Sequence, residues 1–458
     1  MKRNALSIIV LLIVLPMSSL FLWVPLQVKA QTYEWSEPQQ LTTDLADDHY
    51  PSIMQDSSGK IWLVWARTGN LWHKTSSDGG ASWSTSEILV PDILIAGGTS
   101  LLEDSTGRIW VAWACGQYSP YIDWDIFYIT SDDGGLSWEP PRQLTDYPGS
   151  DDIPSLIEVS GEVWIVFHSY GLSYNDDIWY VKTDDGGATW STPIQLTSYS
   201  GREFTPSAMV DSTGKIWVVW CRELTSGNEN LYYKTSIDEG ASWSSDQELT
   251  IHPNDEGHPS TVEDAHGKIF IFYQSATPDI WYKTTTDGGS TWSDYQQLTD
   301  DTYGDGPPYA TLVNDELWVV WPCNRSGNSD IWMSKIATIP ATIDIDPDTL
   351  NLKSNGEWIT AYIELSEGYD VSDIEVNSIL VNDAIPIDVE APATVGDYDL
   401  DSAPDLMVKF DRASIIEWLG AIDYSEDTGK SCFVTLTITG TVLDMTFEGS
   451  DTINILRR

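Results

Sequence analysis

One turn recurs five times along this chain, with the spacing Ser/Thr-x-Asp-x-Gly-x-x-Trp. Successive copies lie 49 to 55 residues apart. This period is the length of one four-stranded blade, and repeats of this size are typical of propellers and solenoids. The repeat therefore predicts an all-β fold made of similar blades. The aspartates of the five turns are Asp78, Asp133, Asp185, Asp238 and Asp287.

Each repeat also carries an almost uninterrupted apolar segment ahead of the turn, such as Ile216 to Trp220. A strand that is apolar on both faces is expected where neighbouring blades cover both sides of its sheet. Six such segments predict six blades, although there are only five turns. Residues 33–42 match the outer strand of a blade with no blade before it. We therefore expect this segment to pair with the sixth blade and close the ring.

The repeat stops near residue 338, after which tryptophan becomes scarce and the strand-like segments change in character. We therefore expect a propeller over residues 31–338 and a smaller β-sandwich (Ig-like) domain over residues 339–458. Within the second domain, only the segment from Ser414 to Leu419 has a helical pattern.

Residues 1–30 have the pattern of a signal peptide. Met1-Lys2-Arg3 precedes an apolar run from about Ala5 to Val24. Because Pro16 interrupts this run, a cleaved signal is favoured over an uncleaved membrane anchor. We therefore predict a secreted or extracellular surface protein with no membrane span after cleavage.

The formal net charge is −47, from 23 Lys plus Arg against 70 Asp plus Glu. This charge disfavours nucleic acid as a partner, since the phosphate backbone would be repelled. Four cysteines are too few for a disulfide framework in a chain of 458 residues. We expect a monomer whose partner is an extracellular glycan or a surface protein.

The aspartate turn is a folding device. An aspartate and a Ser or Thr can satisfy the backbone donors of their own hairpin, while glycine adopts φ values that are costly for other residues. We therefore predict a structural role for the five repeated aspartates. Functional residues are expected at the opposite mouth of the channel, which is formed by the loops between blades and between second and third strands.

Five blades carry a carboxylate at this mouth, three residues before the proline of the inner strand. A ring of acids could provide paired carboxylates for glycoside hydrolysis, bind a cation or bind sugar hydroxyls. The alternative interpretation is that each acid caps its own turn. The five residues are Asp48, Asp151, Glu203, Glu256 and Asp305, and Ala96 stands at this position in the second blade.

The five turns resemble the Asp-box (BNR) repeat of the sialidase superfamily, and the resemblance covers roughly residues 33–335. It implies a six-bladed propeller. Sialidases also need an arginine triad for the substrate carboxylate, an aspartate acid/base and a tyrosine nucleophile paired with a glutamate. Their first arginine belongs to an Arg-Ile-Pro motif, where this chain reads His49-Tyr50-Pro51.

Other parts of the sialidase pattern are also missing. The loop from Ala66 to Asn70 has no carboxylate for the acid/base role, and no arginine lies between Arg222 and Arg325. Because bidentate recognition of a carboxylate by arginine is not replaced by other residues without loss, sialidase activity is disfavoured.

Aromatic and charged residues near the mouth form the best candidate set for sugar binding, because aromatic faces stack on sugar rings while charged groups bind hydroxyls. The candidate ligand-binding residues are His49, Arg67, Tyr118, Tyr121, His168, Arg222, Glu223 and Arg325.

A second candidate site lies in the C-terminal domain. Asp397, Asp399, Asp401 and Asp405 alternate in one loop in the way that calcium-binding loops place oxygen ligands, although Ser402 stands where such loops prefer glycine. This pattern predicts bound Ca²⁺, against the alternative of a solvated acidic turn.

Two classes of function follow from the sequence. In the first, the propeller binds extracellular glycans or surface partners without sialidase catalysis. In the second, it is a glycoside hydrolase, sialidase-like or other, that acts through carboxylates at the channel mouth.

Overall fold

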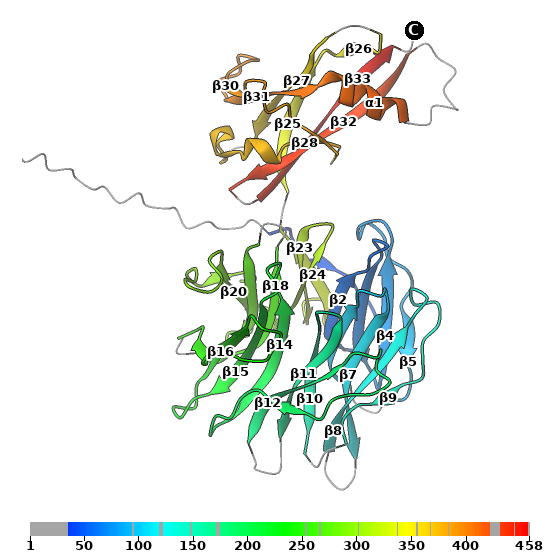
Figure 1. Cartoon of the computed structure of the whole chain (residues 1–458), viewed down its shortest axis with the longest axis vertical. Coiled ribbons are helices and arrows are strands. Elements are labelled where there is room, and N and C mark those ends of the chain that lie inside the picture. Colours follow the sequence, from blue (N-terminus) through cyan, green and yellow to red (C-terminus); the bar gives the residue numbers. More distant parts are fainter. Residues whose placement is uncertain are drawn as a thin grey trace, which may run out of the picture. The chain divides into compact units, whose positions relative to one another are not determined.

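The computed structural model describes residues 35–456 apart from a few short segments (Figure 1). The segments left out between these limits are 94–95, 119–121, 147–148, 171–174, 252–253, 265–266, 301, 337, 354–355, 367, 383, 422–430 and 444. The predicted signal peptide therefore lies outside the described residues.

The chain forms six four-stranded antiparallel sheets, which confirms the predicted six-bladed propeller. In the first five blades the strands follow in chain order from the channel outward, whereas the sixth blade runs from β22 through β23 and β24 to β1. The inner strands contact one another in a closed series from β2 through β6, β10, β14, β18 and β22 back to β2.

The strand bounds follow the repeat. The first three blades are β2 (Asp48–Gln55), β3 (Ile61–Arg67), β4 (Asn70–Ser76) and β5 (Glu87–Val90); β6 (Ala96–Glu103), β7 (Ile109–Tyr118), β8 (Ile122–Ser131) and β9 (Arg142–Gln143); and β10 (Asp151–Val159), β11 (Glu162–Tyr170), β12 (Asp176–Thr183) and β13 (Ile194–Gln195). The last three are β14 (Glu203–Val210), β15 (Ile216–Glu223), β16 (Glu229–Ser236) and β17 (Gln247–Glu248); β18 (Glu256–Glu263), β19 (Ile269–Ser275), β20 (Ile280–Thr285) and β21 (Gln296–Gln297); and β22 (Tyr309–Val313), β23 (Glu316–Cys323) and β24 (Asp330–Lys335) with β1 (Gln39–Gln40).

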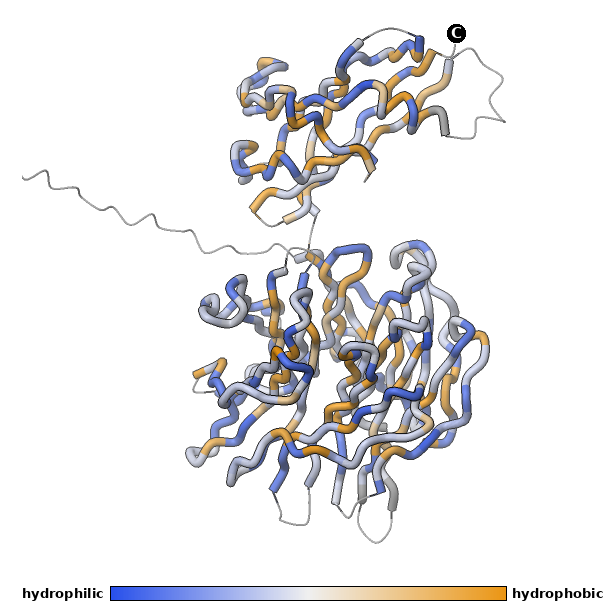
Figure 2. Tube along the Cα trace, viewed as in Figure 1, coloured by the Kyte–Doolittle hydropathy of each residue, from blue (hydrophilic) through white to orange (hydrophobic). Residues whose placement is uncertain are grey.

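The second strand of each blade is the most buried. All seven residues of β3 are buried, as are seven of the eight in β23. Figure 2 shows the hydrophobic segments that recur along the strands. These apolar runs belong to strands covered on both faces, as the sequence predicts.

The N-terminal segment closes the ring, as predicted. Strand β1 pairs antiparallel with β24, and the backbone N–H of Leu41 donates to Ile331 over 2.8 Å. Trp35 donates its indole N–H to the hydroxyl of Tyr282 over 3.4 Å. The sixth blade therefore takes its outer strand from the other end of the chain, which leaves no open edge between the first and last blades.

Each aspartate turn is held by its own side chains. In the first, Asp78 accepts the backbone N–H of Ser82 and the hydroxyl of Ser76, each over 2.8 Å, while Gly80 N–H donates to Ser76. These hydrogen bonds lower the pKa of Asp78 to about 2. Hydrogen bonds to the charged form favour it.

The glycine two residues after the aspartate of each turn lies against the preceding blade. A Cβ on Gly135 would stand 2.0 Å from the Trp62 ring, and one on Gly80 would stand 2.3 Å from the Trp318 ring. Because only glycine allows this approach, the turn joins two blades as well as two strands. The other three pairs are Gly187 on Trp110, Gly240 on Trp164 and Gly289 on Trp217.

The fifth blade has Phe270 in place of this tryptophan, and the sixth blade has no aspartate turn to cover it. Trp35 takes up part of this role, since its ring packs edge-on against Phe272 and Tyr282, each with centroids 5.7 Å away. The five turns thus match five tryptophans, and the closing segment supplies the sixth contact.

A second set of contacts between blades was not predicted. The Asp-Ser-x-Gly turn after an inner strand donates to a glutamate at the end of the next inner strand. Ser57 donates its hydroxyl to Glu103 over 2.9 Å, and Ser212 donates to Glu263 over 2.8 Å. The sequence signal was the glutamate at or next to the end of three of the six inner strands, at Glu103, Glu158 and Glu263.

The C-terminal region is one curled sheet whose strand order is β29-β28-β32-β33-β25-β27-β31-β30, with β26 against β33. Its strands are β25 (Ile339–Asp346), β26 (Thr349–Asn351), β27 (Trp358–Leu365), β28 (Leu380–Val381), β29 (Ile385–Pro386), β30 (Thr394–Gly396), β31 (Asp405–Asp411), β32 (Ser431–Val442) and β33 (Met445–Leu456). Helix α1 (Arg412–Ala421) and the short 3₁₀ helices η1 (Val371–Asp373) and η2 (Val376–Ser378) complete it.

The sheet curls at β25. Ile339 and Pro340 pair in parallel with β33, whereas the rest of β25 pairs antiparallel with β27. Side chains such as Ile345, Phe410 and Ile453 are buried between the two halves. The predicted smaller C-terminal β module is therefore present, and it is one curled sheet.

Among the described residues, no helix has the length and apolar character needed to cross a bilayer.

Removing the closing segment tests its role. The comparison is between a chain that starts at Gln31, after the predicted signal peptide, and a chain that starts at Thr43. We expect the shorter chain to melt at least roughly 5 °C lower, because it loses the β1 ladder and the Trp35 contacts. Calorimetry measures the difference, and equal melting temperatures would refute closure.

Candidate functional site

The inner strands carry a β-bulge where they reach the channel. The pairing register of β2 with β3 shifts between His49 and Ser52, and four other blades shift at the matching place. The residue before the proline then adopts a left-handed φ near 50°, a strained conformation for non-glycine residues. These residues are Tyr50, Ile153, Thr205 and His258.

The bulges line a cavity of about 70 Å³ on the channel axis. All six inner strands contribute to its wall, and all four strained residues lie in it. Bulges re-aim side chains and are common next to functional sites. The second blade contributes Gly98 and Thr99, and a Cβ added to Gly98 would meet Ile153 of the third blade at 2.9 Å.

One side chain in this wall has unmade hydrogen bonds. Thr205 is 5% exposed, and its hydroxyl has no partner among the described residues. Its neighbours are satisfied: Ser155 Oγ accepts the N–H of Ala208, and Thr99 Oγ1 donates to the carbonyl of Tyr50 over 2.6 Å. An unsatisfied buried hydroxyl costs about 1–3 kcal/mol. Thr205 therefore offers a hydrogen bond that a ligand or water can make.

Two histidines lie by the same channel. Burial lowers the pKa of His168 to about 4 and that of His258 to about 4. Both imidazoles are therefore neutral at neutral pH, and each can donate and accept one hydrogen bond. The Nδ1 of His168 has no partner among the residues that the structure describes.

Asp152 was not among the predicted site residues. It is partly exposed, and burial raises its pKa to about 6. Its negative charge contributes to the raised pKa of Tyr50 in the channel wall, after burial itself. Strand alternation is the signal that could have found it, because side chains turn to the other face one residue after the buried Asp151.

The predicted ring of acids lies in the interior. All five side chains belong to residues that are at most 2% exposed. Asp48 accepts hydrogen bonds from the guanidinium of Arg67, and Glu203 accepts from that of Arg222 over 2.7 Å. Asp48 and Glu203 thus hold the inner strand of their blade to the second strand, a structural role that differs from capping a turn.

The acids also accept indole N–H groups from the second strand. Where the second blade has Ala96 in place of an acid, the indole N–H of Trp113 has no partner within the described part of the chain. Among the described residues, the indole of Trp113 thus lacks a hydrogen-bond partner in the one blade that lacks the acid. The three indole bonds run from Trp65 to Asp48 over 2.8 Å, from Trp220 to Glu203 over 2.8 Å and from Trp321 to Asp305 over 2.9 Å.

Arg67 and Arg222 are therefore enclosed. Arg67 is 4% exposed and Arg222 is 7% exposed. The Arg222 guanidinium lies over Tyr232, 4.1 Å from the ring centroid, and pairs with Asp246. The geometry favours a structural role for both arginines, since neither presents a surface to a ligand.

Other predicted residues are accessible. The side chain of Glu223 is 39% exposed and lies 3.7 Å from Arg202, which also pairs with Asp176 over 2.7 Å. His49 is exposed, and Arg325 lies over Trp332 with its guanidinium 4.8 Å from the ring centroid. Of the predicted tyrosines, Tyr121 and the side chain of Tyr118 lie outside the described residues.

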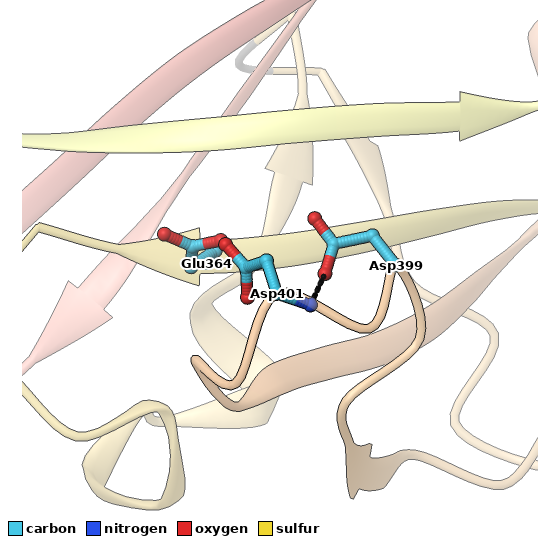
Figure 3. A group of neighbouring side chains, drawn as sticks. All are labelled: Glu364, Asp399 and Asp401. Carbon is cyan, nitrogen blue, oxygen red and sulfur yellow. Dashed lines mark hydrogen bonds between the residues drawn. The ribbon is translucent and has the colours of Figure 1, made fainter.

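The acidic loop of the C-terminal sheet gathers carboxylates (Figure 3). Asp397, Asp399 and Asp405 can place ligand oxygens within 4.8 Å of one another, as can Glu364 of β27 with Asp399 and Asp401. The pKa of Glu364 is raised by burial and by the charges of Asp401 and Asp399. A cation would relieve this repulsion, so the residues present fit a hard oxygen-binding ion such as Ca²⁺.

Comparison with known proteins agrees with the propeller. Residues 21–219 match the BNR repeat-like domain. No curated protein sequence matches the chain. The propeller thus carries the repeat type that its turns resemble, and the predicted Asp-box propeller is confirmed.

Solved structures with the same fold include enzymes that act on glycans. A Dyadobacter fermentans protein of unknown function aligns with a TM-score of 0.56 at 15% identity, over 66% of this chain and 98% of its own. An α-L-arabinanase of Penicillium chrysogenum, complexed with arabinobiose, aligns with 0.52 at 15% identity over the same shares, 66% and 98%. A Streptococcus pneumoniae sialidase aligns with 0.51 at 13% identity, over 66% and 70%. At these identities the likeness shows the fold alone.

Glu256 offers a test of the buried acids. Burial raises its pKa to about 7, so between pH 4.5 and 7 the folded state binds more protons than the unfolded state. Stability contributed by this group therefore falls as pH rises through that window. We expect Glu256→Gln to melt at a higher temperature than the parent at pH 8, where Glu256 is charged. The difference in melting temperature should be smaller at pH 5, where Glu256 is protonated.

Melting curves from pH 5 to 8 give the comparison. Glu139→Gln, which changes an exposed carboxylate, serves as the control and should run parallel to the parent. A Glu256→Gln profile that is also parallel to the parent would show that Glu256 is not a strained buried acid.

Proposed function

We propose that this chain is an exported propeller protein that binds glycans at the channel mouth without sialidase chemistry. The observation that carries this proposal is the unmade hydrogen bond of Thr205 in a cavity at the propeller axis. Sugar hydroxyls both donate and accept, so they complement a threonine hydroxyl and neutral imidazoles.

The size of the cavity defines how a glycan would enter. About 70 Å³ admits one edge of a sugar ring or a hydroxymethyl group, with the rest of the sugar in the mouth above. There the ion pair between Arg202 and Asp176 and the exposed Glu223 supply charged partners for hydroxyls. The arabinobiose complex of the arabinanase supports a glycan ligand by analogy of fold.

The surroundings of the arginines argue against sialidase chemistry. An arginine that recognises a substrate carboxylate must face the ligand, whereas Arg67 and Arg222 are enclosed with acids of their own blades. His49 stands at the position of the first sialidase arginine.

The alternative function is glycoside hydrolysis through carboxylates. Asp152 is the carboxylate that favours it, since a pKa of about 6 suits a general acid or base. Hydrolysis of a polysaccharide panel that is lost in Asp152→Asn, with binding retained, would establish this alternative.

The binding proposal predicts opposite effects for two threonines. Thr205→Val should weaken glycan binding roughly tenfold, since about 1.4 kcal/mol is lost with the hydroxyl, while leaving the melting temperature unchanged or higher. A glycan array identifies the ligand, and titration calorimetry measures the affinity.

The matched control is Thr197→Val. Thr197 is 2% exposed and its hydroxyl accepts the N–H of Ile178 over 2.9 Å, so loss of this hydroxyl should lower the melting temperature and leave binding unchanged. Full affinity in Thr205→Val would move the glycan site away from the channel axis.

Export rests on the signal-peptide pattern of residues 1–30. Within this proposal the mature chain is a secreted or surface-associated monomer, and a surface protein carrying glycans is its alternative partner. N-terminal sequencing of the mature protein tests the cleavage.

We also propose that the acidic loop of the C-terminal sheet binds Ca²⁺. Asp399 belongs to both groups of carboxylates, so Asp399→Asn should remove calcium binding. Calcium at 100 times its Kd should stabilise the parent protein by about 2.7 kcal/mol after prior chelation. Calorimetric unfolding with and without calcium measures this.

Glu390→Gln, which changes an exposed acid of the same region, is the control and should keep the calcium response. A parent protein whose unfolding is insensitive to calcium would leave the loop as a solvated acidic turn.

A further inference from the structure

A second cavity, larger than the one on the channel axis, lies in the sixth blade next to the fifth. It holds about 340 Å³. This volume falls within the range of about 300–1,000 Å³ that is usual for ligand pockets. Its wall includes Trp35, Glu37, Asp300, Tyr303, Arg325 and Ser334.

The fourth blade fills the equivalent space with charged side chains. There Arg222 and Lys234 both pair with Asp246, the lysine over 3.0 Å. The lysine also donates to the carbonyl of Leu196, on the outer strand of the preceding blade, over 3.0 Å. The first blade repeats this last bond between Lys74 and the carbonyl of Leu41, over 2.7 Å.

The strand registers identify the matching residues of the sixth blade. Lys234 pairs with Val218, and Ser334 pairs with Val319, each two residues before the last tryptophan of the second strand. Asp246 stands one residue before the outer-strand partner of Tyr233, and Pro38 stands one residue before the outer-strand partner of Met333. Ser334 therefore corresponds to Lys234, and Pro38 corresponds to Asp246.

Arg222 corresponds in the same way to Cys323. An arginine, a lysine and an aspartate are thus replaced by a cysteine, a serine and a proline. These short side chains leave the cavity open. Ser334 donates instead to the carbonyl of Ser36 over 2.7 Å, and Leu298, the counterpart of Leu196, lines the cavity.

Arg325 partly restores the missing guanidinium. It comes from the loop after β23 and lies over Trp332, 4.8 Å from the ring centroid. Arg67 holds the same position over Trp72 at 4.9 Å in the first blade. The sixth blade therefore keeps a guanidinium over this aromatic ring, but none of its described side chains fills the space of the lysine and the aspartate.

We propose that this cavity is a second saccharide site, separate from the channel mouth, that takes one neutral sugar ring. Tyr303 is 43% exposed and offers an aromatic face to the ring. Carboxylates of Glu37 and Asp300, the Arg325 guanidinium and the serine hydroxyls supply donors and acceptors for vicinal hydroxyls. The two carboxylates disfavour an acidic sugar.

The fourth blade provides the variant that closes the site. Ser334→Lys with Pro38→Asp rebuilds the lysine and aspartate of that blade, so the side chains should fill the cavity and keep the fold. Tyr303→Ala removes the exposed aromatic face without touching the core. The probes are neutral sugars: L-arabinose, D-galactose, D-glucose, N-acetylglucosamine and their short oligomers.

Saturation-transfer NMR and titration calorimetry measure binding to the full chain. We expect at least one probe whose affinity falls about tenfold or more in both variants and stays unchanged in Thr205→Val. Loss of binding in Thr205→Val alone would support the channel-mouth site and overturn this second site. Loss in the cavity variants alone would support the second site, and the channel-mouth site is tested separately by the probes whose affinity falls in Thr205→Val.

A panel in which no probe responds to either cavity variant would also overturn the proposal. Should the double variant melt at a lower temperature than the parent, Tyr303→Ala decides the outcome, because its side chain lies at the surface.

Discussion

The close contact between the glycine two residues after the aspartate of each turn and a tryptophan of the preceding blade connects the blades of this propeller. A Cβ at Gly135 would come within 2.0 Å of Trp62, so neither blade can take this packing without a glycine there. Loss of such a tryptophan costs about 3–5 kcal/mol in a typical core. Because each blade depends on the next, the series must return to its start. Trp35 and β1 close this series. The aspartate turn is thus a structural element, and it lies on the face away from the candidate sites.

At the opposite mouth the same scaffold ties inner strands to second strands through the buried acids Asp48, Glu203 and Asp305. Where arginine, lysine and aspartate complete the network, as in the fourth blade, the space is full. Where they are missing, cavities remain, as in the sixth blade. The channel axis differs again, since backbone bulges carry Tyr50, Thr205 and His258 into a small cavity. Sites for ligands therefore arise where the repeat departs from its own pattern.

Periodicity made the fold readable from the sequence. The number of apolar second strands gave the number of blades, and residues 33–42, which match an outer strand with no blade before it, indicated how the ring closes. The site was harder to read, because partners in different strands set the environment of a side chain. In the sequence, Asp48 and Glu203 look like members of a catalytic ring. In the structure, they accept hydrogen bonds from Arg67, Arg222 and two indoles, which gives them a structural role. Asp152 could have been found by alternation, whereas the unmade bond of Thr205 and the cavity beside Ser334 depend on packing that no local pattern encodes.

We propose that ligands bind in the openings of the mouth face, and that the aspartate turns and buried acids only support these sites. Crystals of the full chain soaked with the short neutral oligosaccharide that binds most tightly test this claim directly. We expect sugar density at Thr205 on the channel axis, or beside Tyr303 in the sixth blade, with the Asp48–Arg67 and Glu203–Arg222 pairs unchanged. Density on the face of the aspartate turns, or a sugar carboxylate or hydroxyl that displaces Asp48 from Arg67, would contradict it.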